Sequence, residues 1–195
     1  MATQTNEYPT KAYGATAPDS GVGPMQITRR GLRDDDVLIE ISHCGICHSD
    51  LHSARNDWGR TTYPIVPGHE IVGTVAAVGD AVTRHAVGDR VAIGCMVDSC
   101  MECSHCEADL EQYCLDGGMT GTYNGTDRRD GTPTYGGYSE RIVAREEFVL
   151  KVPDALPMAE AAPLLCAGIT TYSPLRTWKV GPGSNAGWRD LIVKT

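Results

Sequence analysis

The 195-residue sequence predicts a mainly β fold, a small barrel or sandwich with a few short helices. Its 22 glycines and 11 prolines favour frequent turns, and therefore short strands rather than long helices. Short runs rich in β-branched residues recur along much of the chain, and Gly or Pro separates one run from the next. This length allows one well-buried domain, or one domain and part of another.

The first half of the chain contains most of the expected strands. Residues 1–35 show no clear pattern. Beyond them, four apolar runs predict strands, with a Cys/His-rich turn after the first run; the runs are at residues 37–42, 63–68, 71–79 and 87–93.

The second half begins with a cysteine-rich loop at residues 95–114, which interrupts the strand pattern. An Asn-Gly turn follows at residues 124 and 125, and residues 138–144 predict another strand. Residues 154–175 are rich in helix-forming Ala and Leu, and Gly168 with the β-branched residues after it predicts a division into two short helices. The Gly-Pro-Gly-Ser stretch at residues 181–184 is typical of a linker.

Charge and hydropathy exclude several classes of protein. The net charge of −8 argues against a nucleic-acid-binding surface, because phosphate binding draws on clustered Lys and Arg. No apolar run approaches the length of a membrane span, and the polar start of the chain lacks the apolar segment of a secretory signal. We therefore expect a cytoplasmic protein with neither nucleic acid nor membrane as a partner. A reducing compartment disfavours disulfides, so the eight cysteines point to metal binding or catalysis.

Four of the cysteines follow the spacing C-x2-C-x2-C-x7-C, at Cys100, Cys103, Cys106 and Cys114. Three thiols at such intervals can turn around one point, and the fourth returns after a loop long enough to close a tetrahedron. Structural zinc sites are closed and four-coordinate with thiolate ligands, so this spacing predicts a structural zinc. An iron–sulfur cluster is the main alternative, although in the ferredoxin motif the fourth cysteine follows after three residues and precedes a proline. Disulfides and unpaired buried cysteines are the remaining alternatives.

A second group of potential metal ligands is spread along the chain. Residues 44–52 read Cys-Gly-Ile-Cys-His-Ser-Asp-Leu-His, and Gly-His-Glu follows at residues 68–70. A site built from Cys47, His69 and Cys166 would hold a zinc ion with its fourth position free, which is the open arrangement of a catalytic zinc. Spacing alone does not select these three residues from eight cysteines and six histidines.

Further motifs make the selection, because together they resemble one family. Besides the Cys-Gly-Ile-Cys-His motif, the chain contains Pro-Gly-His-Glu-Ile-Val-Gly, Val-Gly-Asp-Arg-Val, Gly-Gly-Tyr-Ser-Glu and Ala-Pro-Leu-Leu-Cys-Ala-Gly-Ile-Thr-Thr-Tyr-Ser-Pro-Leu. In this order the motifs resemble the zinc-dependent medium-chain alcohol dehydrogenases of the cinnamyl-alcohol-dehydrogenase type and their bacterial aldehyde-reductase relatives. The resemblance covers the chain from about Lys11 to Gly183 and implies a GroES-like barrel with a zinc-binding loop.

The resemblance also implies the zinc ligands and the residues that support them. Cys47, His69 and Cys166 would hold the catalytic zinc, and a substrate oxygen or water would take the fourth position. Glu70 would be an alternate ligand or would support the ligands, and Asp50 would fix the His69 ring through its other nitrogen. With the four-cysteine site, two zinc ions per chain are expected.

The same resemblance implies a proton path and a cofactor contact. The Ser49 hydroxyl would pass the proton of the alcohol, and His52 would carry it toward solvent. His48 would lie near the phosphates or ribose of the cofactor, which in this family is NADP(H). Met119 stands near the position where the plant lignin-pathway enzymes place a tryptophan, so a broad range of aldehydes is expected. Trp58 would line the substrate channel, or be a core or surface residue.

No function is assigned to the other cysteines and histidines. Cys44 and Cys95 are expected to be small buried apolar residues. We expect no functional role for His43, His85 and His105.

The end of the chain departs from the family pattern. In the family, the Gly-Pro-Gly linker leads to a strand and a Gly-x-Gly-x-x-Gly turn that binds the cofactor pyrophosphate. Here we expect a catalytic domain at residues 1–180, followed at 181–195 by a linker and an atypical short C-terminus in place of the nucleotide-binding Rossmann domain. The expected activity is interconversion of primary alcohols and small aldehydes, weak or absent in this chain alone.

The alternative is a zinc-binding fragment without turnover of its own, and a zinc-ribbon nucleic-acid binder is disfavoured by the acidic balance. The family is commonly homodimeric.

Overall fold

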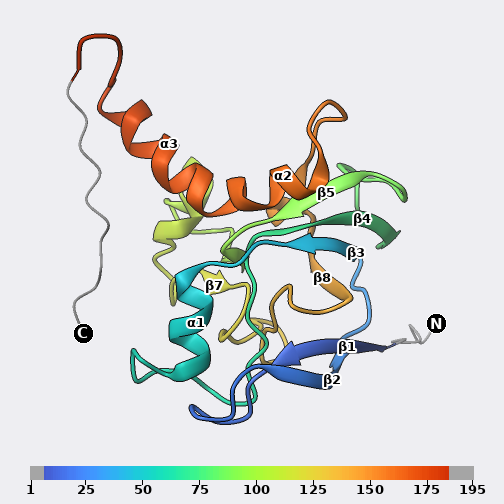
Figure 1. Ribbon diagram of the computed structural model, residues 1–195. Helices are drawn as coiled ribbons and strands as arrows, with labels where there is room; N and C mark the ends of the chain where they lie inside the picture. Colours follow the sequence, from blue (N-terminus) through green and yellow to red (C-terminus); the bar gives the residue numbers. More distant parts are fainter. Residues whose placement is uncertain (1–6, 185–195) are drawn as a thin grey trace.

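A five-stranded antiparallel sheet lies at the centre of the computed structural model, which describes residues 7–184 (Figure 1). Its strand order is β8–β3–β4–β5–β9, with β3 at Asp36–Cys44, β4 at Ile71–Val78, β5 at Arg90–Ile93, β8 at Arg141–Arg145 and β9 at Leu150–Lys151. The main core is built from β-branched side chains of these strands, including Val37, Ile39, Ile71, Val91 and Ile93. The mainly β fold is confirmed, with strands near four of the expected positions.

A hairpin precedes this sheet, where the sequence predicts no element. β1 (Tyr8–Gly14) pairs antiparallel with β2 (Gly23–Arg29), and backbone hydrogen bonds from Tyr13 to Tyr138 (2.7 Å) and from Glu140 to Lys11 (3.0 Å) fix the hairpin beside β8. The expectation of loose patterning over residues 1–35 is therefore wrong. The inward positions of β1 are occupied by Thr10 and Ala12, whose small or polar side chains leave a weak apolar signal.

Two further expectations for the first half are corrected. Residues 63–68 form no regular strand; only an isolated bridge joins Ile65 to Ala15, because two prolines in this short segment remove backbone donors. The Cys/His-rich segment is not simply a turn, since it continues into helix α1 (His48–Arg55). Asp50 accepts a hydrogen bond from the backbone N–H of the N-cap residue Cys47 (2.9 Å), and Asn56 ends the helix in the left-handed conformation.

The cysteine-rich loop projects between two short paired strands, β6 (Met96–Asp98) and β7 (Thr120–Gly121). Within it lie two single turns of 3-10 helix, η1 (Cys106–Ala108) and η2 (Glu111–Tyr113). A third, η3 (Glu146–Phe148), joins β8 to β9. The loop therefore contains little regular structure of its own.

The helical segment near the end consists of α2 (Met158–Ala161), the 3-10 turn η4 (Ala162–Leu165) and α3 (Ala167–Thr177). Division of this segment is confirmed, but its position is not: Gly168 lies inside α3, and the break falls at Cys166, with φ −129° and ψ −72°. In Figure 1, α2 lies over the sheet, whereas α3 extends away from it. No side chain of α3 is buried within the described part of the chain.

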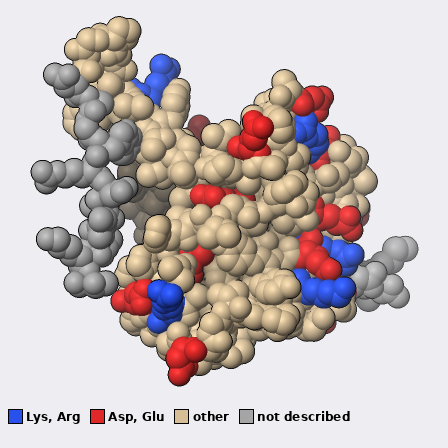
Figure 2. Space-filling model, in the orientation of Figure 1, with Lys and Arg blue, Asp and Glu red and all other residues tan. Residues whose placement is uncertain are grey.

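Residues 181–184 form a turn, in which the Ser184 N–H donates to Gly181. The rest of the expected C-terminal unit, residues 185–195, lies outside the described residues. Figure 2 shows Asp and Glu mixed with Lys and Arg on one face of the molecule. Among residues 7–184, no helix is long and apolar enough to span a membrane.

Candidate metal centres

The first candidate centre brings together four side chains from three separate parts of the chain. The potential ligand atoms of Cys47, His69, Glu70 and Cys166 all lie within 4.8 Å of one another. The sulfurs of Cys47 and Cys166, 119 residues apart in sequence, are 4.0 Å apart. Cys47 begins α1, His69 and Glu70 precede β4, and Cys166 lies at the break before α3.

Glycines allow the backbone to approach this centre closely. Gly68 has a φ of +102°, and a Cβ there would lie 2.8 Å from the Tyr138 backbone nitrogen and 2.9 Å from the Cys44 sulfur. A Cβ on Gly45 would lie 1.9 Å from a carboxylate oxygen of Glu70. Any larger residue at either position would displace a residue of the centre or one beneath it.

Asp50 holds the centre together through four hydrogen bonds. Its Oδ1 accepts from the Gly68 N–H (3.0 Å) and from His69 Nδ1 (2.9 Å). Its Oδ2 accepts from the Cys47 N–H (2.9 Å) and the Tyr138 hydroxyl (3.0 Å). Since Nδ1 of His69 is engaged by Asp50, Nε2 is the ring nitrogen that remains free to bind a metal together with the thiols.

The local environment also affects the ionisation of these groups. Burial raises the pKa of Asp50, but the hydrogen bonds from His69 and Cys47 outweigh it, so the pKa lies below its usual value. Burial likewise opposes ionisation of Cys47, yet hydrogen bonding from Ser49 brings its pKa below the usual value. Burial raises the pKa of Glu70. A carboxylate at Asp50 and a readily ionised thiol at Cys47 suit a metal-binding role.

The remaining predicted residues lie on α1. Ser49 contributes to the Cys47 environment, and His52 lies one turn further along the helix. His52 Nδ1 contacts Asp57 Oδ2 at 2.7 Å, and its ring centroid lies 5.3 Å from that of Trp58 and 6.2 Å from that of the exposed His48. No hydrogen bond joins Ser49 to His52 in residues 7–184. Asp57 is not among the residues expected from the sequence. Its signal in the sequence is an acidic residue five positions after His52, directly beyond the helix cap Asn56.

The second candidate centre is the four-cysteine group. The sulfurs of Cys100, Cys103, Cys106 and Cys114 all lie within 4.8 Å of one another, and Cys106 and Cys114 are buried. The backbone N–H groups of Cys103 and Leu115 point at the sulfurs of Cys100 (3.3 Å) and Cys103 (3.4 Å), respectively. The hydrogen bond from Leu115 is the largest of the influences that lower the pKa of Cys103 to about 6. All eight cysteines are free thiols.

Of the cysteines without an assigned role, Cys44 fits the expectation and Cys95 does not. Cys44 is half-buried against the main core, and burial raises its pKa to about 12. Cys95 is exposed, because it follows the end of β5 and faces Cys166 rather than the core. It lines an apolar cavity of about 660 Å³ together with Met119, Leu165 and Ile169.

The three histidines for which no role was expected lie outside both groups. His43 is exposed, His85 is buried without a hydrogen bond to its ring within the described residues, and His105 contacts the Tyr113 carbonyl at 2.6 Å.

Comparison with known proteins gives concordant matches. Residues 33–154 match the family model described as the alcohol dehydrogenase GroES-like domain. The NADP-dependent alcohol dehydrogenase C 1 of Mycolicibacterium smegmatis is 58% identical over 172 residues, which are 88% of this chain and 49% of that protein. The aldehyde reductase YahK of Escherichia coli is 54% identical over 178 residues, which cover 91% of this chain and 50% of that protein.

Solved structures agree with these relatives. A cinnamyl alcohol dehydrogenase from Sorghum bicolor has a TM-score of 0.87 at 42% identity, covering 91% of this chain and 50% of that chain. The cinnamyl alcohol dehydrogenase of Helicobacter pylori, complexed with NADP(H), has a TM-score of 0.88 at 42% identity. This match covers 91% of the present chain and 51% of that chain.

The chain thus spans about half the length of the curated relatives that it matches. The family resemblance expected from the motifs is confirmed by the family model, the relatives and the fold alike. We conclude that the chain belongs to the alcohol dehydrogenase GroES-like domain family.

Proposed function

We propose that this chain supplies the zinc-binding catalytic domain of an NADP(H)-dependent alcohol dehydrogenase that interconverts primary alcohols and aldehydes. The observation that carries the proposal is the convergence of Cys47, His69 and Cys166, together with Glu70. An apolar cavity reaches this centre through Cys95, which lines the cavity and contacts Cys166. The names of the relatives, an NADP-dependent alcohol dehydrogenase and an aldehyde reductase, support the reaction class and the cofactor.

The donor set of the first centre fits zinc. Two thiols and one imidazole are ligands that zinc prefers, and the chain positions them within reach of a single ion. A zinc ion in such a set supplies Lewis acidity, which lowers the pKa of an alcohol and polarises an aldehyde carbonyl. The apolar cavity lined by Cys95 and Met119 offers room for the carbon chain of the substrate.

Asp50 and Glu70 support this ligand set in different ways. Asp50 holds the His69 ring so that Nε2 faces the two thiols, which makes it a positioning residue. Glu70 is 3% exposed, and although burial raises the pKa of its carboxyl, the Ala167 backbone next to Cys166 partly offsets that rise. Its carboxylate is therefore available either as an alternate ligand or as a brace between His69 and the start of α3.

The proton leaves along α1 in this proposal. The Ser49 hydroxyl, near Cys47, accepts the proton of the alcohol as it releases its own, and His52 one turn away carries the released proton toward solvent. Asp57 orients His52 through the 2.7 Å contact to Nδ1, which leaves Nε2 to exchange the proton. His48 lies exposed on the same helix, where it would contact the cofactor phosphates or ribose.

The four-cysteine centre has a structural role in the proposal. Its donors are all thiols, and the surrounding N–H groups already stabilise negative charge on Cys100 and Cys103. Such a closed set suits a structural zinc that organises the loop. A homodimeric state stays a prediction from the family resemblance, and a cytoplasmic location stays a prediction from the polar start of the chain and its lack of long apolar runs.

The metal content of the purified chain tests the two sites separately. We expect about two zinc ions per chain by elemental analysis, and loss of about one in each of Cys166→Ser and Cys103→Ser. Cys44→Ser is the matched control. Cys44 packs against the core and is not a proposed ligand, so this variant should keep both ions. Zinc content that stays unchanged in Cys166→Ser would contradict the first site.

Consumption of NADPH with benzaldehyde or cinnamaldehyde then tests the activity. Turnover that disappears in Cys47→Ala but persists in Cys44→Ser would support the catalytic assignment. Zinc-replete protein without turnover, even when supplied with the remaining half found in the relatives, would favour the alternative of a non-catalytic zinc-binding module.

A further inference from the structure

Arginines from outside the cysteine-rich loop hold both of its ends. Asp98, two residues before Cys100, accepts a hydrogen bond from Arg145 Nη1 at 2.9 Å. Asp116, two residues after Cys114, contacts Arg128 through both its backbone oxygen and its carboxylate, each 2.7 Å from Nη2. Arg128 Nη1 also donates to the Gly118 carbonyl at 3.1 Å.

The contact at the first end continues toward the thiols. Asp98 is 6% exposed, and the oxygen that binds Arg145 also accepts the Ser99 N–H at 2.9 Å. The Ser99 hydroxyl lies 3.3 Å from the Cys106 sulfur. The position of Arg145 is therefore transmitted to the buried Cys106 through three short polar contacts.

The contact at the second end belongs to a short segment that is itself tied to the barrel. We name residues 127–130 the arginine strap. Within it, Asp127 pairs with Arg33 through both carboxylate oxygens at 3.0 Å, and with Arg30 at 3.2 Å. Arg129 pairs with Asp35, directly before β3. Because its neighbours on both sides are held to the body of the fold, Arg128 reaches the loop from a fixed base.

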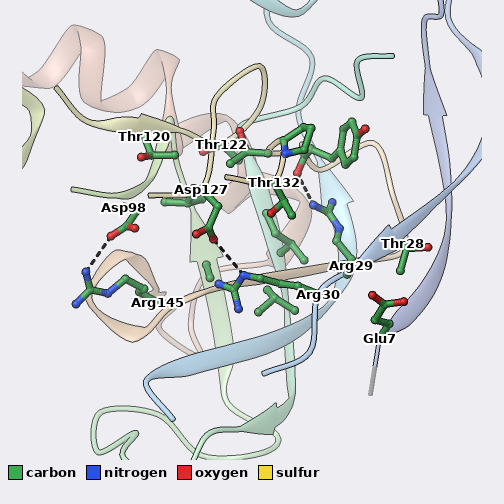
Figure 3. Close-up of a pocket in the computed structure, with 17 residues that line it drawn as sticks. Glu7, Thr28, Arg29, Arg30, Asp98, Thr120, Thr122, Asp127, Thr132 and Arg145 are labelled. Carbon is green, nitrogen blue, oxygen red and sulfur yellow. Dashed lines mark hydrogen bonds and ion pairs between the residues drawn. The ribbon is translucent and has the colours of Figure 1, made fainter. Parts of the chain in front are cut away.

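The two ends are also connected to each other. Arg145 Nε lies 3.2 Å from Asp35, the partner of Arg129 in the strap. Figure 3 shows Arg145 directed at Asp98 and Arg30 directed at Asp127 around one cavity of about 300 Å³. One network of ion pairs therefore links the barrel, the strap and both ends of the cysteine-rich loop.

The loop has few apolar contacts that could replace this network. Val97 at its start packs into the main core, but Leu110, Tyr113 and the following Leu115 face outward, exposed by 40%, 63% and 64%. Hydrophobic burial therefore contributes little to its closure. Bidentate contacts of a guanidinium with a carboxylate and carbonyl oxygens fix geometry as well as adding attraction.

We propose that Arg128 is a positioning residue for the four-cysteine metal site, holding residues 116–118 so that Cys114 stays beside the other three thiols and retains the metal. This inference rests on the proposed metal site at these cysteines. Arg145 performs the corresponding task at Asp98, but it has further partners in Asp35 and Glu147, so Arg128 offers the cleaner test.

The experiment measures release of zinc from the full chain to a chromogenic chelator in stopped flow. The two release phases are assigned with Cys166→Ser and Cys103→Ser, each of which should lack one phase. Arg128→Met should accelerate the four-cysteine phase about fivefold or more, because three charge-assisted contacts are lost. Arg128→Lys should give an intermediate rate, since a single ammonium cannot make the bidentate contact.

Two further variants make the test specific. Asp116→Asn keeps the backbone contacts and should have a smaller effect than Arg128→Met, because the Asp116 carboxylate is 75% exposed. Arg141→Met on β8 is the matched control. It removes an exposed ion pair with Glu40 on β3 and should leave both phases unchanged.

The outcomes separate this inference from the proposed function. A wild-type chain without the Cys103-dependent zinc would refute the proposed metal site itself. A wild-type chain with both zinc ions, but with the same four-cysteine phase in Arg128→Met, would overturn the role of Arg128 alone. Equal acceleration of both phases would also overturn it, because the effect would then be general destabilisation.

Discussion

Asp50→Asn tests the positioning of His69 without replacing any of the proposed zinc ligands Cys47, His69 and Cys166. The aspartate accepts four hydrogen bonds, two on each oxygen, and is 3% exposed. Asparagine has nearly the same shape but only one accepting oxygen. Whichever way the amide turns, its NH2 group faces a backbone N–H, that of Cys47 or that of Gly68.

The magnitude of the effect follows from this conflict. A buried N–H left without an acceptor costs about 1–3 kcal/mol, and the charge-assisted bond to His69 is weakened as well. We therefore expect zinc affinity at the first site to fall about 10- to 100-fold, as is typical when a partner that orients a ligand is changed. The four-cysteine site shares no contact with Asp50 and should keep its affinity.

Competition with a chelator of known affinity measures this directly, with the two sites resolved by Cys166→Ser and Cys103→Ser. Asp57→Asn is the matched control: it also removes a carboxylate that contacts a histidine, but that residue, His52, is not a proposed ligand. Zinc affinity in Asp50→Asn within about twofold of wild type would refute the argument that Asp50 positions His69.

Three other predictions concern stability. Gly68→Ala should lower the free energy of unfolding, measured in urea, by about 3 kcal/mol, because the added Cβ meets backbone and sulfur atoms. Gly88→Ala is the control: its φ is +94°, but open space surrounds it, so it should cost clearly less. Equal costs for the two variants would contradict the packing argument. Removal of metal with EDTA should lower the thermal midpoint and the protease resistance of the cysteine-rich loop, with recovery on adding zinc but not magnesium. Full stability without zinc would contradict a structural zinc at the four cysteines. Arg129 lowers the pKa of Asp35 to about 2, below the value of about 3.9 in an unfolded chain, so the resulting stability is present above about pH 4 and is lost as the pH falls toward 2. The stability advantage of wild type over Asp35→Asn should therefore shrink between about pH 6 and pH 3, and a constant difference would exclude this linkage.

The sequence predicted most reliably those features whose signal is local. The strands at β3, β4 and β5 are short runs rich in Val and Ile that end before a glycine, and their burial follows from that pattern. The hairpin of β1 and β2 escaped prediction because its inward side chains include Thr10 and the buried Arg29. Arg29 is accommodated there by carbonyl oxygens of residues 135, 136 and 141, partners more than 100 residues away in sequence.

The candidate sites divide along the same line. Spacing alone grouped Cys100, Cys103, Cys106 and Cys114, because a loop of this length can close around one ion. Cys47 and Cys166 are 119 residues apart, so no local pattern could pair them, and only the resemblance to a family did so. Their approach depends on the placement of α1, which follows β3 in the chain, and of η4, which packs against β3, β4 and β5.

By itself, the sequence therefore determined the mainly β class, the four-thiol loop and the family, because each is encoded in short-range spacing or in motif order. Tertiary structure decided how Asp50 meets four donors, why Cys95 faces the apolar cavity, and how the arginine strap holds the cysteine-rich loop. Those features arise from contacts between distant segments. Such contacts depend on which side chains become buried together, and that is set by the folding of the whole chain rather than by any local run of residues.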